Sequence, residues 1–323
     1  MPFSPSSFPL PPNELLQRIG PMGDEDPTGT YERTGLEHRR LIEGALPEGW
    51  TWPGRTVLDF GCGVGRILRQ FAPEAEESEF WGCDIDGQSI DWLRENLSPP
   101  FRFFESADAA GLPQEDGYFD LIYALSVYTH LTDNWAGWLL EHHRVLKDDG
   151  LLFATFLGEG MIETLIGEKW DEDRIGMNPL MHGYPWKYGG PITFNSPWWI
   201  RSHWGRAFDI LELRPQMGPE AMVNHGYVVM RKKPVELTEE DLLRLDPDEP
   251  REILALQHHV EQLRDETLEL RPALEEEREL VAQRDRQLAN AAEQGRLLHE
   301  IQSSASWRLT APLRTAKQRL GRR

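Results

Sequence analysis

The chain has 323 residues, with 54 acidic and 34 basic side chains and a net charge of −20. This length leaves room for a single large core beside an appended segment. The charge argues against a nucleic-acid substrate, because phosphate backbones require Lys and Arg on the binding face. We expect the two cysteines, Cys62 and Cys83, to be buried free thiols in a cytoplasmic protein. We also expect neither a leader peptide nor a membrane span.

Residues 1–50 are predicted to form an arm and covering helices. The first 12 residues hold five prolines with serines between them, which indicates an extended, mobile arm. Asn13 suits the cap of a short helix through Arg18, and residues 31–43 suit a second helix.

The strongest signal is a strand, a glycine turn and a predicted helix. Residues 56–60 suit a buried parallel strand, and residues 64–72 suit a helix. Between them the turn holds three glycines, Gly61, Gly63 and Gly65. The spacing departs from the G-x-G-x-x-G of dinucleotide sites, and Asp59 precedes the turn. A carboxylate there would repel a pyrophosphate but hold an amino group, so the pattern favours a nucleoside that carries an amino acid.

Further strands and helices alternate along the next 100 residues. Predicted strands lie at 80–84, 101–105, 119–125 and 151–157, and predicted helices at 87–97 and 133–147. Asp84 ends the second strand, and Asp108 and Ser126 follow the third and fourth. Ligands of open α/β sheets bind at these carboxyl ends.

In this order the motifs resemble the class I S-adenosylmethionine-dependent methyltransferases. The resemblance implies an α/β fold over residues 51–233, with a Rossmann-like, seven-stranded, mostly parallel sheet and helices on both faces. Residues 208–213 and 227–230 would supply the last two strands, and the seventh would run antiparallel between its neighbours.

The resemblance also implies roles for single residues in binding S-adenosylmethionine. The three glycines would let the backbone approach the cofactor, Asp59 would orient its methionine end, Asp84 would hold the ribose and Asp108 the adenine; Ser126 is a further candidate. The N-terminal helices would cover the cofactor. Tyr31 and Arg33 are then candidate contacts, with ordinary surface packing as the favoured alternative.

His130 is the candidate catalytic base. It lies in the segment 126–134 after the fourth strand, where Thr132 suits the cap of the next helix. An imidazole titrates near neutral pH, and an alcohol acceptor must lose its proton as the methyl group arrives. The alternative is a histidine that organises the loop by hydrogen bonding.

Residues 158–206 form an aromatic insert in the predicted domain. It contains seven Trp and Tyr side chains, with a helix expected from Asn195 or Ser196 to Arg206. The insert suits either a lid over an amphipathic substrate or a small hydrophobic core. Candidate substrate contacts are His182, Tyr184, Trp186 and Trp199, and further polar candidates are Lys187 and His203. The histidines lack metal-ligand spacing, so we expect no metal site.

The composition changes after Lys233. Residues 234–250 carry seven carboxylates and one arginine, which indicates a solvated linker. Residues 251–305 show apolar positions at alternating spacings of four and three, typical of a coiled coil that self-associates. Pro272, Glu277, Arg284 and Gly295 interrupt the pattern and predict a kinked or broken coil; a solitary helix is the alternative.

The tail, residues 306–323, has six basic and no acidic side chains. It suits contact with anionic lipid at the inner membrane face, and a disordered tail is the alternative. Its Ser-Trp-Arg-Leu-Thr-x-Pro-Leu-Arg run is similar to the ending that follows coiled coils in bacterial surface-polysaccharide glycosyltransferases and methyltransferases.

These features together predict a methyltransferase that O-methylates a glycan or glycolipid intermediate in cell-surface polysaccharide synthesis. Two alternatives remain open. The enzyme could act on an unrelated small metabolite, or the chain could be a coiled-coil scaffold that recruits glycosyltransferases.

Overall fold

The computed structural model describes residues 4–16, 26–182, 184, 190–218 and 224–312. The chain divides into two compact units, Met1–Gln262 and Leu263–Arg323. The first unit contains the sheet and its covering helices. The second contains the greater part of one long helix.

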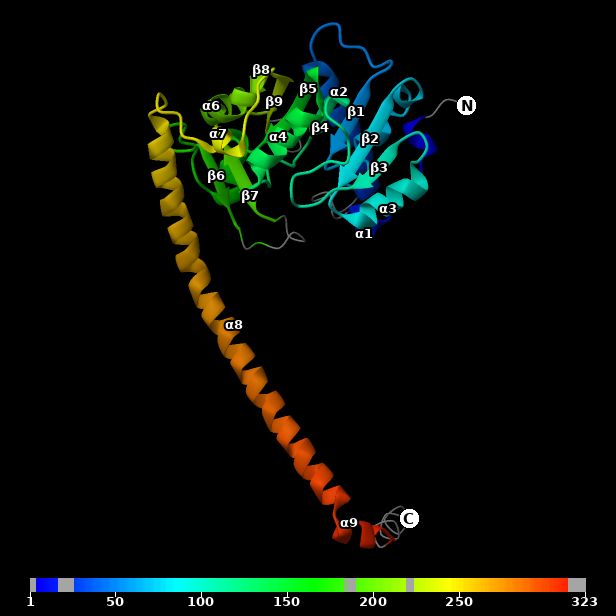
Figure 1. Cartoon of the computed structure of the whole chain (residues 1–323), viewed down its shortest axis with the longest axis vertical. Helices are drawn as coiled ribbons and strands as arrows, with labels where there is room; N and C mark the ends of the chain where they lie inside the picture. Colours follow the sequence, from blue (N-terminus) through cyan, green and yellow to red (C-terminus); the bar gives the residue numbers. More distant parts are fainter. Residues whose placement is uncertain (1–3, 17–25, 183, 185–189, 219–223, 313–323) are drawn as a thin grey trace. The chain divides into compact units, whose positions relative to one another are not determined.

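A seven-stranded sheet organises the first unit (Figure 1). Its strands in chain order are β1 (Thr56–Phe60), β2 (Glu79–Asp84), β3 (Arg102–Glu105), β4 (Phe119–Ala124), β5 (Leu146–Phe156), β8 (Phe208–Arg214) and β9 (Gly226–Lys232). Their order in space is β3-β2-β1-β4-β5-β9-β8. The first five are parallel, and β9 is antiparallel to both neighbours. The predicted fold class is therefore confirmed.

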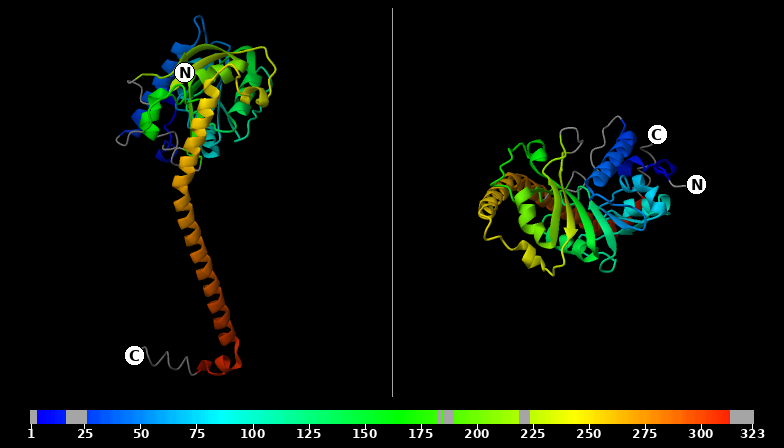
Figure 2. Two further views of the ribbon diagram at one scale, coloured as in Figure 1. Left: turned by 90° about the vertical axis from the view of Figure 1, so that its left-hand side faces the viewer. Right: turned by 90° about the horizontal axis from the view of Figure 1, so that it is seen from above.

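The central strands bury side chains on both faces because successive residues point to opposite sides. Leu58 and Ile122 belong to one apolar cluster, and Val57 and Leu121 belong to the other. Helices α4 (Trp135–Val145) and α6 (Pro197–Ala207) contribute to the first cluster. Helices α2 (Pro27–Ala45) and α3 (Gly87–Asn96) contribute to the second, so both faces are covered (Figure 2).

The predicted helix at 64–72 is wrong. The chain makes successive turns there and then two short 3-10 helices, η3 (Leu68–Phe71) and η4 (Glu74–Glu76). Gly63 and Gly65 have φ angles of 52° and 74°, which no α-helix accommodates. The backbone dihedral angles in the glycine turn therefore prevent a regular α-helix from beginning there.

The N-terminal segment is held against the domain, which corrects the expected mobile arm. The guanidinium of Arg69, itself fully buried, donates to the carbonyls of Pro5 and Phe8 at 2.7 and 3.0 Å. Phe8 is buried against Phe101, and residues Pro5–Ser7 form the 3-10 helix η1. One buried arginine thus ties down backbone carbonyls that a proline-rich segment leaves unpaired.

The helices near the N-terminus begin close to their expected positions. Helix α1 covers Asn13–Leu16, and the rest of its expected length lies outside the described residues. Helix α2 begins earlier than expected, because Asp26 accepts a hydrogen bond from the Gly29 amide and caps it. Helix α4 has Asn134 rather than Thr132 at its cap position.

The aromatic insert forms a small subdomain on the sheet. It comprises α5 (Glu159–Ile166), the antiparallel pair β6 (Met177–Leu180) and β7 (Ile192–Asn195), and α6. The hydroxyl of Ser196 accepts from the Trp199 amide at 3.3 Å, which confirms the predicted cap of α6. A separate apolar cluster fills this region, and it includes Leu157, Ile162 and Phe194. The insert therefore contains the small hydrophobic core that was one of its two expected roles.

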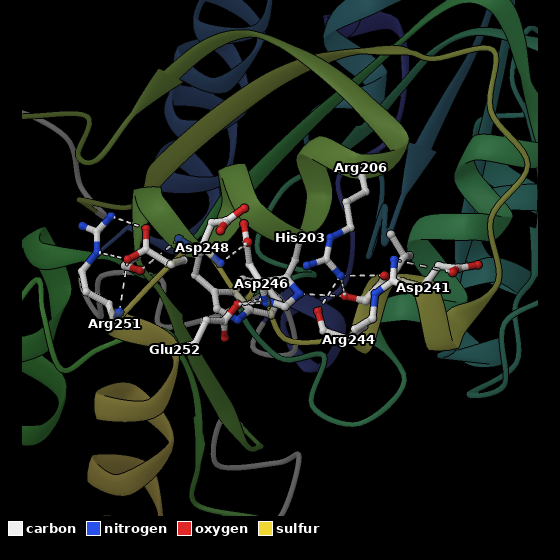
Figure 3. Close-up of polar contacts among 12 residues, drawn as sticks. His203, Arg206, Asp241, Arg244, Asp246, Asp248, Arg251 and Glu252 are labelled. Carbon is white, nitrogen blue, oxygen red and sulfur yellow. Dashed lines mark hydrogen bonds and ion pairs between the residues drawn. The ribbon is translucent and has the colours of Figure 1, made fainter.

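Residues 234–250 are not simply a solvated linker. They contain helix α7 (Glu239–Leu243), whose Leu242 is fully buried. The Arg206 guanidinium donates to the carbonyls of Asp241, Leu242 and Arg244 (Figure 3). Acidic side chains can face solvent while the backbone between them packs against the domain. Composition alone cannot distinguish such a segment from a solvated linker.

The long helix α8 covers Arg251–Ser303 and continues through Pro272, so the expected interruption of the helix is wrong, whereas a kink in it stays a prediction. Proline has no N–H to donate to the carbonyl one helical turn earlier. Pro272 is exposed, so water can hydrogen-bond to that carbonyl instead. Apolar side chains at the predicted coil positions, such as Leu274, Val281 and Leu288, are exposed. Their pairing with another helix stays a prediction. A short helix, α9 (Ala305–Leu309), follows, and no described helix is long and apolar enough to cross a membrane.

Candidate active site

The candidate residues gather where β1, β2 and β4 end. These strands are neighbours in the sheet and run parallel, so their carboxyl ends share one edge. Gly61 follows β1, Asp84 is the last residue of β2, and Ser126 lies just beyond β4. The fold thus brings together residues that the sequence separates by more than 60 positions.

Hydrogen bonds from β2 shape the glycine turn. The amides of Gly61 and Cys62 both donate to the Cys83 carbonyl at 2.9 Å, and the Gly63 amide donates to Asp84 Oδ2 at 2.8 Å. Gly61 has a φ of 77°, and a Cβ there would lie 2.3 Å from Val127 Cγ2. Glycine is therefore required at this position both for backbone conformation and for space.

Asp59 is enclosed beneath the turn. Its side chain is 2% exposed, and burial raises the pKa of its carboxyl group to about 8. The nearby Tyr123 hydroxyl lowers that pKa in part, whereas the Asp84 carboxylate raises it further. Asp59 Oδ2 is enclosed and has no hydrogen-bond partner of good geometry within the part of the chain that the structure describes. An ammonium group beside Asp59 would satisfy this oxygen and favour the carboxylate form.

Asp84 joins two loops at the end of β2. Its Oδ1 accepts from the Asp86 amide at 2.9 Å, while Oδ2 accepts from Gly63. Burial raises its pKa, and these two amides oppose the rise. Each carboxylate oxygen can accept more than one hydrogen bond, so both remain able to receive ribose hydroxyls. Ile85 follows with 60% of its side chain exposed, an apolar surface at the same edge.

Asp108 lies in the exposed turn after β3. Its carbonyl accepts from Trp138 Nε1 at 3.2 Å and from Asn134 Nδ2 at 3.1 Å, which fixes the turn against α4. Its carboxylate faces solvent. The structure therefore anchors the position of Asp108, and its contact with adenine stays a prediction.

Ser126 and His130 lie beside a histidine that the sequence analysis missed, His225. Ser126 adopts a φ of 57°, and its amide donates to Thr155 Oγ1 at 2.7 Å. Its hydroxyl is 3.5 Å from His225 Nδ1. His225 directly precedes β9, and the start of an antiparallel strand lies at the carboxyl edge of its parallel neighbours. The antiparallel direction of β9 is the feature from which the sequence analysis could have placed His225 at this edge.

The ring of His130 is held by its Nδ1 atom, which lies 2.7 Å from the carbonyl of Pro191. A carbonyl oxygen only accepts, so the proton resides on Nδ1 and the lone pair on Nε2. Burial lowers the pKa of His130, which keeps the ring neutral near pH 7. This arrangement serves both roles considered for the residue, a base through Nε2 and a loop organiser through Nδ1.

The other sequence candidates are distributed differently. Tyr31 is fully buried and its hydroxyl donates to the Val64 carbonyl at 2.9 Å, so it supports the glycine turn from within, whereas Arg33 is exposed. Trp199 lies in the core, stacked 4.3 Å from His203, and not on a substrate-facing surface. His182 and Tyr184 are exposed.

Trp186 and Lys187 lie outside the described residues. Within the described ranges no group of three His, Cys, Asp or Glu side chains could hold a metal ion. Cys62 and Cys83 are buried free thiols, as expected. A surface pocket of about 550 Å³ beside His143 and Lys233 lies at the opposite edge of the sheet, where β5 begins and β9 ends.

Comparison with known proteins agrees with this geometry. Residues 57–150 match the family described as a methyltransferase domain. The chain is 32% identical over 140 residues to the malonyl-[acyl-carrier protein] O-methyltransferase of Geobacter sulfurreducens, covering 42% of this chain and 51% of that protein. It is 35% identical over 102 residues to the 2-methyl-6-phytyl-1,4-hydroquinone methyltransferase of Synechocystis, covering 31% of each.

The matches thus span about half, or less, of these relatives. Among solved structures, the magnesium protoporphyrin IX methyltransferase of Synechocystis with bound SAH is 19% identical, with a TM-score of 0.48 over 68% of this chain and 94% of that one. At that level it adds nothing to what the strand order already establishes. The strand order and the glycine turn between β1 and β2 are those of a Rossmann-like methyltransferase fold, and residues 57–150 match a methyltransferase domain.

Proposed function

We propose that this protein transfers the methyl group of S-adenosylmethionine to a small acceptor molecule. The proposal rests chiefly on the Gly63–Asp84 hydrogen bond, which couples the glycine turn to the acidic end of β2. In this assignment the turn meets the cofactor through its backbone, and Asp59 holds the ammonium of the methionine end. Asp84 accepts the ribose hydroxyls, and Asp108 receives the adenine amino group. The bound cofactor supplies an activated methyl group.

His130 would remove the proton of the acceptor as its oxygen takes the methyl group. Support comes from the 2.7 Å contact between Nδ1 and the Pro191 carbonyl, which leaves Nε2 as a proton acceptor. Because an activated methyl group needs little further activation, alignment of acceptor and cofactor at the sheet edge would supply much of the rate enhancement. Ser126 and His225 border the same position and would help to orient the acceptor.

We propose a glycan or glycolipid intermediate of cell-surface polysaccharide synthesis as the acceptor. The exposed Tyr184 and His182 of the insert favour an amphipathic acceptor, since aromatic faces stack on sugar C–H groups. The resemblance of the tail to the ends of polysaccharide enzymes supports the same assignment. The name of one relative, a hydroquinone methyltransferase, instead favours a small metabolite as the alternative.

The exposed apolar side chains of α8 favour self-association through a coiled coil. The basic tail would add peripheral contact with an anionic membrane. A chain whose function lay only in recruiting glycosyltransferases would lose it when residues 263–323 are removed. A methyltransferase acting on a free metabolite would keep its turnover.

The first experiment is calorimetric titration of the whole chain with S-adenosylmethionine. We expect micromolar binding, roughly −8 kcal/mol, and at least about a tenfold loss in Asp84→Ala. Asp91→Ala, which removes an exposed carboxylate from α3, is the matched control and should bind as the unaltered chain does. Labelled methyl transfer to glycans would follow. A folded chain that binds no cofactor would refute the proposed function.

A further inference from the structure

The segment that carries His130 is held by strand β7 of the aromatic insert. The Thr193 amide donates to the Thr129 carbonyl at 2.8 Å, and the Thr193 hydroxyl donates to the Leu131 carbonyl at 2.9 Å. His130 itself donates from Nδ1 to the Pro191 carbonyl at 2.7 Å. Thr129 and Thr193 are buried, where hydrogen bonds are stronger than in water. Three consecutive residues of this segment thus depend on the position of β7.

Strand β7 lies between the His130 segment and β6. Thr193 is opposite Pro179 in the antiparallel pair, yet its amide points away from β6 to the Thr129 carbonyl. Two residues further on, the Asn195 amide donates to the Leu157 carbonyl at 2.8 Å. Successive amides of a strand point to alternate sides, so β7 pairs with β6 at one edge and holds the catalytic segment at the other. A displacement of β6 would therefore displace the candidate base.

Strand β6 is in turn fastened to the base of α8, residues 251–262, which belongs to the same compact unit as the sheet. His259 Nε2 donates to the Pro179 carbonyl at 2.9 Å, and Asn178 Nδ2 donates to Gln262 Oε1 at 2.7 Å. Asn178 is 1% exposed, so loss of its contact with Gln262 would leave a buried donor unpaired. The base of α8 therefore fixes β6 through both the backbone and a buried side chain.

We propose that His259 and Gln262 are positioning residues for methyl transfer, which hold His130 in place through β6 and β7. The inference rests on the proposed function, in which His130 removes the proton of the acceptor. Contiguous hydrogen bonds and rigid secondary elements carry coupling of this kind. Methyl transfer depends on close alignment of the reacting groups, so a small shift of the base is enough to slow it.

NMR of the full chain with ¹⁵N-labelled histidine tests the link at the ring of His130. The contact with Pro191 places the proton on Nδ1, and that tautomer is expected in the unaltered chain. The variant His130→Gln identifies the signal by its loss. Gln262→Met keeps the length of the side chain but removes the acceptor for Asn178. It should give a mixture of tautomers at His130 and speed hydrogen exchange of the Thr193 amide by about tenfold or more.

Gln262→Glu is the matched variant, because a carboxylate oxygen at this position still accepts from Asn178. Both variants lose the exposed contact from Gln262 Nε2 to Glu168, so the difference between them isolates the buried bond. Gln262→Glu should keep the Nδ1 tautomer and the slow exchange, as should Gln257→Ala, which alters an exposed residue of the same helix. Should Gln262→Met fail to fold, His259→Phe removes the other contact to β6 and gives the same test.

Catalysis supplies a second measurement. With an acceptor that the unaltered chain methylates, kcat should fall about tenfold in Gln262→Met while the affinity for S-adenosylmethionine stays unchanged. The two quantities separate because the proposed cofactor contacts lie at the ends of β1 and β2, whereas β7 holds only the segment of the base. A variant that lost both to the same degree would indicate general damage to the domain and would count against the inference.

The inference is overturned if Gln262→Met leaves the His130 tautomer and the exchange of the Thr193 amide unchanged. Equal changes in Gln262→Met and Gln262→Glu would overturn it too, since lost packing would then account for the effect. Failure of the unaltered chain to bind S-adenosylmethionine is a different result: it refutes the proposed function, and the NMR comparison between the variants still reports whether α8 holds His130.

Discussion

The sheet edge and the junction of α6, α7 and α8 both enclose polar side chains, but they treat them differently. At the junction, His203 Nδ1 lies 2.7 Å from the Leu242 carbonyl and Nε2 lies 2.8 Å from Glu252 Oε1, which also accepts from the Asp246 amide (Figure 3). At the sheet edge, Asp59 Oδ2 and His38 Nδ1 have no hydrogen-bond partner among the described residues.

This difference separates structure from function. A buried polar group without a partner costs free energy, so a chain keeps such groups only where something offsets the cost. At the junction the His203 ring and the Glu252 carboxylate satisfy each other, and this contact attaches the first turns of α8 to the domain. In the proposed function, the ammonium group of the cofactor supplies the donor that Asp59 Oδ2 lacks among the described residues. Substitutions should accordingly lower stability at the junction and lower binding at the edge.

The largest expected loss of stability follows Glu252→Ala. His203 and Glu252 are both almost fully buried, and removing one partner leaves the other enclosed and unpaired. We expect the free energy of unfolding to fall by about 3–5 kcal/mol, measured by urea denaturation. Glu261→Ala breaks the exposed pair with Arg174 and should cost less than about 1 kcal/mol. Equal effects of the two substitutions would contradict a structural role for the buried pair at the junction.

Asp59→Asn should instead raise stability while lowering cofactor affinity. The pKa of Asp59 is about 8 in the folded chain and roughly 3.9 in the unfolded chain. As pH rises above about 4 the unfolded chain releases this proton first, so its cost to the native state grows until about pH 8 and is absent at lower pH.

The asparagine variant, which cannot ionise, should therefore gain about 1–4 kcal/mol over the unaltered chain at pH 7 and little near pH 4. Urea denaturation at the two pH values measures this difference, and calorimetry should show weaker S-adenosylhomocysteine binding. A variant that is less stable at pH 7 would mean that Asp59 is a structural residue.

Gly61→Ala should cost about 1–3 kcal/mol, because an alanine Cβ is strained at a φ of 77° and meets Val127. Its cofactor affinity should fall as well, since the turn must shift. Gly44→Ala is the matched control: it lies in α2 with open space around its Cβ position, and alanine there should gain about 0.5–1 kcal/mol. Thermal unfolding of both variants checks the opposite signs.

Much of the sheet could be predicted from local pattern. The apolar runs of β1 and β4 lie in the middle of a parallel sheet, where both faces are buried, so they appear in the sequence as continuous apolar runs. The glycine turn, the Asp84 position and the Ser196 cap were likewise predictable, because each depends on a few adjacent residues. Short-range steric and hydrogen-bonding preferences are properties of the local chain.

Other features required the assembled structure. Arg69 holds Pro5 across more than 60 residues, and His203 meets Glu252 across 49, so neither the fixed N-terminal segment nor the docked α7 region has a local signature. His38 and His225 come from α2 and the start of β9. His225 is buried, and the Nδ1 atom of His38 is enclosed, only because these segments pack together, and burial of that kind is a property of the tertiary structure alone.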